Sequence, residues 1–140
     1  MIDWDALERG GSMPSFTAAQ KAAATALVAA MPDVKPGKVA SLWPLAKQCP
    51  DISQLDFGDA VQQNVAIKSL LASSKRLNRQ KLLDHIAAGA QPVRVNPFTS
   101  EPMLTKTDEG LVIVDGHHRL AAMQLMGAKT VKLWTVPATS

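Results

Sequence analysis

The sequence predicts an α+β fold in which a helical extension precedes a compact domain. An alanine-rich segment and several prolines occupy the first part of the chain, and short apolar runs alternate with helix-capping signals after Gln62. The chain has 140 residues, of which 46% are hydrophobic and 19% charged, and this suits one domain with a modest extension. We therefore divide it into a helical N-terminal extension, residues 1–61, and a domain, residues 62–140.

The extension is predicted to form short helices separated by prolines. Thr17 and Gln20 have capping-box spacing, and the alanine-rich stretch that follows them ends at Pro32. The residues expected along one side of this helix are Phe16, Ala23, Leu27 and Ala30. After a turn at residues 33–37, a second helix kinked at Pro44 is expected. Its apolar residues would be Val39, Leu42, Leu45 and Ala46.

The domain is predicted to alternate strands with helices. The expected order is a strand at 64–67, a helix at 78–89, strands at 92–96 and 111–114, a helix at 117–126 and a strand at 130–136. Asn78 is a suitable N-cap for the first helix, and Gly89 is a suitable end. Residues 111–114 are four consecutive apolar residues, which suggests a strand buried on both faces.

Charge is unevenly distributed between the two parts. Residues 1–61 contain five Lys or Arg and seven Asp or Glu, whereas residues 62–140 contain ten and five. The domain is therefore the part expected to attract anions such as nucleotides or nucleic acid. The most apolar window, residues 22–31, is about half the length of a membrane span, and the chain does not begin like a secretory signal. The single cysteine cannot form a disulfide within the chain. We therefore expect a cytoplasmic protein without a membrane partner.

A phosphate-binding loop is predicted where the buried strand gives way to the helix after it. The loop contains Asp115, Gly116, His117, His118 and Arg119. Gly116 permits a tight turn, and the N–H groups after it lie at the positive end of the helix dipole, which favours an anion. Arg119 suits bidentate contacts with phosphate oxygens, and each histidine can donate to an oxygen or move a proton.

Two interpretations remain open for the other loop residues. Asp115 is either the helix N-cap or a ligand of Mg²⁺ beside a phosphate, since a bare carboxylate repels a phosphate. His117 and His118 either satisfy backbone carbonyls or contact a ligand, and the flanking Gly116 and Arg119 favour ligand contact. His117, His118 and Asp115 are thus the candidate catalytic residues, with Asp115 also the candidate metal ligand.

Residues 112–122, Val-Ile-Val-Asp-Gly-His-His-Arg-Leu-Ala-Ala, resemble the signature segment of the ParB/sulfiredoxin-like superfamily. The resemblance covers residues 62–136 and implies a small mixed sheet with packed helices. Members include partition proteins that bind CTP, sulfiredoxins that use ATP, free serine kinases and nucleases. In several of them, the residues that match positions 116–119 bind nucleotide phosphates, and Gly116, His118 and Arg119 are the cofactor-binding candidates that this implies. The resemblance also places Ser74, Lys75 and Arg76 near the nucleotide pocket, although a solvated helix face explains these residues equally well.

Three departures from the superfamily narrow the expected activity. His117 stands where sulfiredoxins have their catalytic cysteine, so sulfinic acid reduction is not expected. Residues 62–83 contain no Asp or Glu, which counts against a kinase because the family's glutamate lies there. The chain ends at Ser140, without room for the helix-turn-helix domain of a partition protein.

The resulting expectation is a phosphate-binding domain whose ligand is a nucleotide, with CTP or ATP and Mg²⁺ as candidate ligands. Hydrolase, nuclease or phosphotransfer activity, on a nucleotide or on nucleic acid, stays open. The alternative is a non-catalytic interaction or structural module of a phage- or plasmid-type assembly, which would dock a protein partner through the extension. An apolar stripe left exposed on the extension would favour docking, and a packed stripe would favour a self-contained binding domain.

Overall fold

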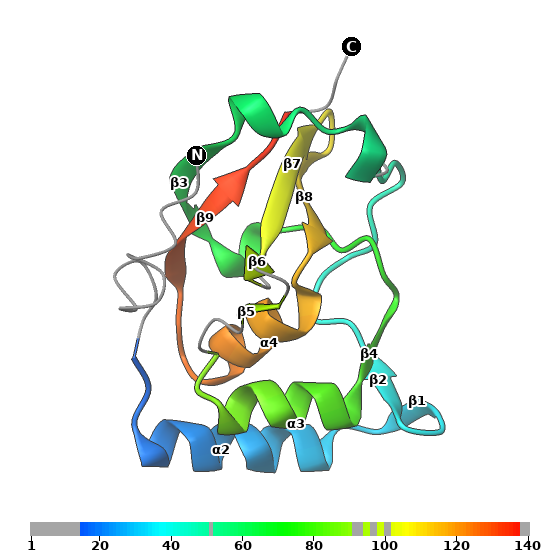
Figure 1. The fold of residues 1–140 in the computed structure, drawn as a ribbon. Helices are drawn as coiled ribbons and strands as arrows, with labels where there is room; N and C mark the ends of the chain where they lie inside the picture. Colours follow the sequence, from blue (N-terminus) through cyan, green and yellow to red (C-terminus); the bar gives the residue numbers. More distant parts are fainter. Residues whose placement is uncertain (1–14, 51, 91–93, 96–97, 100–101, 138–140) are drawn as a thin grey trace.

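The computed structural model describes residues 15–50, 52–90, 94–95, 98–99 and 102–137 (Figure 1). Within these residues the fold is mixed α+β, as predicted. The helices are α2 (Ala18–Ala30), α3 (Arg79–Ala87) and α4 (His117–Leu125), with 3-10 turns η1 (Ile52–Gln54), η2 (Phe57–Asp59) and η3 (Ile67–Ser69). The strands are β1 (Asp33–Lys35), β2 (Lys38–Ala40), β3 (Val61–Ala66), β4 (Arg76–Asn78), β5 (Arg94–Val95), β6 (Phe98–Thr99), β7 (Met103–Thr107), β8 (Gly110–Asp115) and β9 (Thr130–Thr135).

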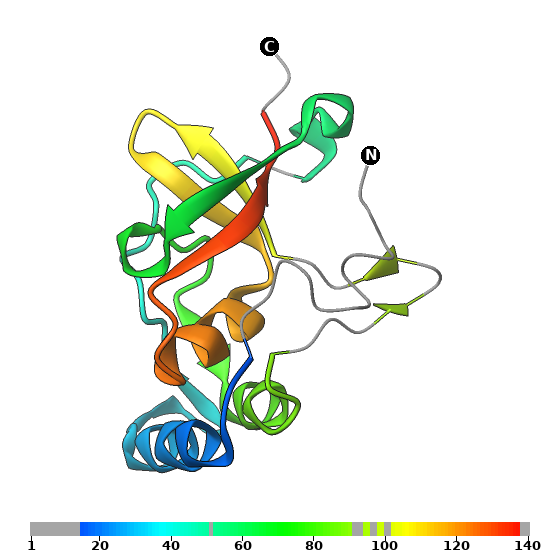
Figure 2. The same ribbon diagram turned by 90° about the vertical axis from the view of Figure 1, so that its left-hand side faces the viewer.

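The larger sheet is mixed and has the order β3-β9-β7-β8. β7 pairs with β8 in antiparallel and with β9 in parallel orientation, and β3 pairs antiparallel with β9. Below this sheet lie α4, then α3 and then α2 (Figures 1 and 2). A smaller antiparallel sheet, β1-β2-β4, leads into α3. The start of α4 therefore lies between the larger sheet and the start of α3.

The hydrophobic core lies mainly between the larger sheet and the helices. Its fully buried members include Leu104, Ile113, Leu120, Met123 and Leu133. None of the described helices combines the length and the apolar character that are needed to cross a membrane.

Helix α2 begins as predicted, but it packs through a different side. Thr17 Oγ1 accepts a hydrogen bond from Gln20 N at 3.1 Å, and Gln20 Oε1 accepts one from Thr17 N at 2.8 Å, which completes the capping box. The buried residues of the helix are Ala24 and Val28, whereas Leu27 is 52% exposed. The predicted side was wrong because an alanine-rich helix is apolar on most of its surface, so the periodicity did not single out the side that faces α3.

The prediction of a second helix in the extension was also wrong. Residues 33–40 form the hairpin β1–β2, in which Gly37 has a φ of +72°. The chain after it runs alongside residues 72–75, since Ser41 N donates to Lys75 O at 3.0 Å and Ala46 N donates to Ala72 O at 2.8 Å. These long-range backbone bonds compete successfully with a helix that Pro44 already weakens.

The extension shares the core of the domain. Ala24, Val28, Val39 and Trp43 belong to the same buried cluster as Leu120. In its described part, the α-helical character predicted for the extension holds for α2 alone, and the boundary at Gln62 stays a prediction.

The elements predicted for the domain are largely confirmed. Asn78 caps α3 by accepting from Lys81 N at 2.9 Å, and Gly89 follows the helix with a φ of +65°. The last strand, β9, and the strand before the loop, β8, occur close to their predicted positions. The strand predicted at 92–96 is described only at β5, and its other residues lie outside the described part. β7, which the sequence did not reveal, separates β8 from β9 in the sheet.

Candidate functional site

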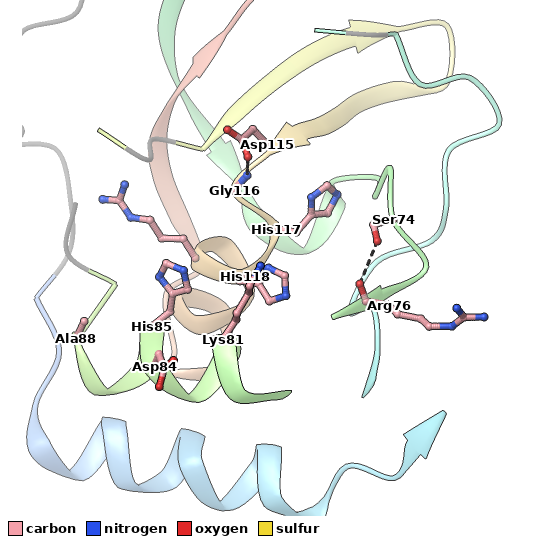
Figure 3. Close-up of a pocket in the computed structure, with 11 residues that line it drawn as sticks. Ser74, Arg76, Lys81, Asp84, His85, Ala88, Asp115, Gly116, His117 and His118 are labelled. Carbon is pink, nitrogen blue, oxygen red and sulfur yellow. Dashed lines mark hydrogen bonds between the residues drawn. The ribbon is translucent and has the colours of Figure 1, made fainter. Parts of the chain in front are cut away.

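A pocket with a volume of about 620 Å³ opens at the start of α4 (Figure 3). The loop predicted to bind phosphate, residues 115–119, forms one wall. Three residues of α3 and its C-cap form another wall, and one residue before β4 and one within it complete the lining. Those six residues are Lys81, Asp84, His85 and Ala88, together with Ser74 and Arg76.

Gly116 makes the turn from β8 into α4. It is the N-cap of α4 and has a φ of +88°, which side chains other than glycine rarely adopt. A Cβ at this position would lie 2.6 Å from Pro102 Cα. The predicted tight turn is therefore confirmed, and the chain's own Pro102 lies against the backbone at this turn.

Asp115 lies exposed at the edge of the pocket. Its Oδ1 accepts a hydrogen bond from Gly116 N at 2.9 Å. Gly116 is the N-cap, and no side chain caps the helix, so the interpretation of Asp115 as N-cap was wrong. Among the described residues, no three His, Cys, Asp or Glu side chains gather to hold a metal ion. A role of Asp115 toward Mg²⁺ stays a prediction that needs oxygen ligands from a bound phosphate.

The first turn of α4 has backbone donors that bond to no described residue. Within the described residues, the N–H groups of His117 and His118 make no hydrogen bond, and the first turn contains no acidic residue. These groups lie at the positive end of the helix dipole. The start of α4 is therefore suited to an anion that enters the pocket.

The ring of His117 is held from two sides. Its Nε2 accepts a hydrogen bond from Ser73 N at 3.0 Å, and Ser73 Oγ lies 3.3 Å from the same nitrogen while it donates to Ile113 O at 2.7 Å. The Trp43 ring packs in a T-shaped arrangement with a centroid distance of 6.5 Å. Burial lowers the pKa of His117, and the carboxylate of Asp115 opposes this shift only in part.

His118 is also held through its Nε2, which accepts a hydrogen bond from Asn78 N at 2.8 Å. Burial, followed by the positive charge of Lys81, lowers the pKa of His118 to about 4. Since a backbone N–H can only donate, the Nε2 of each histidine carries no proton and the Nδ1 carries it. Both rings are thus neutral, and they satisfy backbone N–H groups instead of the carbonyls considered from the sequence.

The lowered pKa of His118 predicts an acid-sensitive fold. In the unfolded chain His118 takes up a proton near its ordinary pKa of 6.5, whereas in the folded protein it does so only near 4, so acidification favours unfolding between these values. We expect the free energy of unfolding to fall by roughly 1 kcal/mol from pH 7 to pH 4.5, because partial exposure of the ring screens much of the shift. Urea unfolding at both pH values measures this change.

His118→Gln is the matched variant for this pH dependence. Glutamine offers an acceptor without titrating, so the variant should lose part of the slope, while His117 and His85, whose pKa values are also lowered, keep the remainder. Asp33 does not interfere, because its hydrogen bond with Arg79 lowers its pKa from 3.8 and its contribution is lost only below this window. An unchanged slope in His118→Gln would contradict the prediction.

Arg119 is the most deeply buried charged residue of the pocket, with 1% of its surface exposed. Its Nε donates to Ala90 O at 2.8 Å, beyond the C-terminal end of α3. Ala90 itself has a φ of +56°, which is unusual for a residue with a side chain. Arg119 therefore links the start of α4 to the end of α3, and the phosphate contact predicted for it remains untested.

The three residues predicted before α3 are placed differently. Ser74 and Arg76 line the pocket, and Ser74 Oγ donates to Arg76 O at 3.0 Å. Lys75 is exposed and does not line the pocket. Figure 3 shows the guanidinium of Arg76 extending away from the other labelled side chains, whereas Lys81 rises from α3 toward His118.

The sequence did not reveal the contribution of α3 to the pocket. His85 is half-buried in the pocket wall, and this burial lowers its pKa. The sequence did contain a signal for this wall. Asp84, His85 and Ala88 follow Lys81 by three, four and seven residues, and this spacing places all four on one helix face. All three histidines of the chain thus line one pocket.

No protein-family model matches the chain, and no curated protein matches it.

Proposed function

We propose that the pocket binds a phosphate-bearing ligand of the nucleotide class, with CTP and ATP as the first candidates. The observation that carries this proposal is the pair of N–H groups of His117 and His118, which lie at the start of α4 and have no acceptor among the described residues. A phosphate there would accept from both groups and would be favoured by the helix dipole.

The charge and the size of the pocket support the same ligand class. Among the described residues, its lining contains three cations, Arg76, Lys81 and Arg119, and two carboxylates, Asp84 and Asp115. With neutral histidines the balance is positive, which favours an anion. A volume of about 620 Å³ lies within the range typical of small-molecule sites. The resemblance of residues 112–122 to the ParB/sulfiredoxin-like signature supports a nucleotide in particular.

We propose that the pocket binds its ligand, and we assign no catalytic step to it. A general base needs an unprotonated nitrogen or oxygen within reach of the ligand. The unprotonated Nε2 atoms of His117 and His118 already accept hydrogen bonds from Ser73 N and Asn78 N, so neither atom is available as a general base. Asp115, exposed at the rim, is the residue we assign to Mg²⁺ when a phosphate supplies further ligands.

The alternative, an assembly module that docks through the extension, has less support. Ala24 and Val28 of α2 are fully buried, so the apolar side of this helix packs within the molecule. Leu27 is the one exposed leucine on α2. The other large apolar side chains exposed in the described part of the extension are Val34, Leu45, Phe57 and Val61, which lie on other segments and so do not extend a stripe along this helix.

Calorimetric titration of the full chain tests the proposal with CTP, ATP and GTP, each with and without Mg²⁺. We expect saturable binding, and we expect Lys81→Ala to weaken it about tenfold by removing the cation that faces the first turn of α4. Lys132→Ala is the matched control, since Lys132 is exposed on β9 and does not line the pocket. The proposal fails if no nucleotide binds at millimolar concentration, or if both variants weaken binding equally.

A further inference from the structure

The segment of residues 73–78 borders the pocket and is fastened at both of its ends to α4. At one end Ser73 N donates to His117 Nε2 at 3.0 Å, and at the other end Asn78 N donates to His118 Nε2 at 2.8 Å. The two acceptors are neighbours in the first turn of α4. Between these anchored ends lie Ser74 and Arg76, which line the pocket.

Strand β4, at the end of this segment, needs an acceptor that the small sheet does not supply. β4 is the last strand in the order β1-β2-β4, so it pairs only with β2. The N–H of Asn78 points away from β2, and the ring of His118 accepts it. A buried backbone donor without an acceptor is costly, so this bond contributes to the placement of the strand.

The segment has other anchors besides the two rings. Ser73 Oγ donates to Ile113 O at 2.7 Å, and Lys75 O accepts from Ser41 N at 3.0 Å. In its second half, β4 pairs with β2, which holds the backbone of Arg76 in the small sheet. The bond from Asn78 N to His118 adds a direct tie between β4 and α4.

We infer that His117 and His118 are positioning residues that form a two-point clamp: each ring accepts a backbone N–H of the segment 73–78 and so holds Ser74 and Arg76 at the rim of the pocket. This role differs from the direct phosphate contact and the proton transfer that the sequence suggested for the two rings. The clamp's effect on a ligand rests on the proposed function, whereas the clamp itself is defined by the protein alone.

The clamp can be observed directly in the wild-type protein. In a uniformly ¹⁵N-labelled sample, an N–H···N hydrogen bond transmits a scalar coupling between its two nitrogens. We expect this coupling between Asn78 N and His118 Nε2, and between Ser73 N and His117 Nε2. If both couplings are absent while both rings are neutral, the clamp is overturned.

A pair of amide variants then tests what the clamp does. His118→Gln places an acceptor near the position of Nε2, whereas the shorter His118→Asn offers the same chemical group too far from Asn78 N. We expect amide hydrogen exchange of Asn78 to accelerate at least about tenfold in His118→Asn and to stay near the wild-type rate in His118→Gln. Exchange at Leu133, in the core strand β9, should not change in either variant.

Nucleotide affinity separates the clamp from a direct ligand contact. Under the clamp, His118→Asn weakens binding about tenfold and His118→Gln restores most of it. If His118→Gln keeps the Asn78 amide protected but loses binding as completely as His118→Asn does, His118 contacts the ligand directly and the positioning role is overturned. If the wild-type protein binds no nucleotide, the proposed function fails, and the couplings and exchange rates still decide for or against the clamp.

Discussion

Gly116→Ala is expected to lower the free energy of unfolding by about 3 kcal/mol or more. Two costs combine at this position. The φ of +88° places an alanine in the left-handed region, which costs about 1–2 kcal/mol. The new Cβ would also lie 2.6 Å from Pro102 Cα, and a backbone atom cannot move aside as the end of a flexible side chain can. Urea unfolding followed by tryptophan fluorescence measures the loss.

Gly37→Ala is the matched control for the contribution of backbone strain alone. Gly37 also has a positive φ, +72°, but a Cβ there would meet no atom within 4 Å. We expect this variant to cost about 1 kcal/mol. Equal losses in the two variants would show that Pro102 does not constrain the start of α4. A larger loss at Gly116 would show that the loop requires glycine for the packing of the protein itself, before any ligand approaches.

Arg119→Met is expected to lower the free energy of unfolding by about 3 kcal/mol. Methionine retains an apolar side chain of similar length, but it cannot donate to Ala90 O, which accepts from Arg119 Nε at 2.8 Å. Only 1% of the surface of Arg119 is exposed. The carbonyl of Ala90 would therefore lose its charged donor inside the protein. The same urea experiment measures this change.

Arg76→Met is the control, because it makes the same substitution at an exposed residue of the same pocket. We expect its unfolding free energy to stay within about 0.5 kcal/mol of the wild type. The opposite pattern would be informative. If Arg119→Met leaves stability unchanged but abolishes nucleotide binding, Arg119 is a ligand contact, as the sequence suggested, and its bond to Ala90 is incidental.

The local features of this protein could be predicted from the sequence because neighbouring residues decide them. The capping box of Thr17 and Gln20, the N-cap Asn78 and the turn at Gly116 each involve atoms a few residues apart, and all three occur. The α+β class followed from these signals and from the apolar runs between them. The position of the candidate site, at the junction of β8 and α4, was predicted for the same reason.

Other features depend on contacts between distant residues. The side of α2 that faces α3 is an example, because an alanine-rich helix offers similar surfaces in several directions. The segment after Gly37 is another, since it became a strand through pairing with β4, nearly forty residues later in the chain. The half-buried position of His85 likewise depends on how α3 packs beside α4.

The sequence by itself determined which residues start α4: a glycine at the turn, two histidines and an arginine. Only the tertiary structure decided what those side chains do. His117 and His118 accept from Ser73 and Asn78, which are 44 and 40 residues away, and Arg119 donates to Ala90, 29 residues away. The physical reason is that a side chain's type limits what it can donate or accept, whereas its actual partner depends on which distant backbone group the folded chain brings within 3 Å.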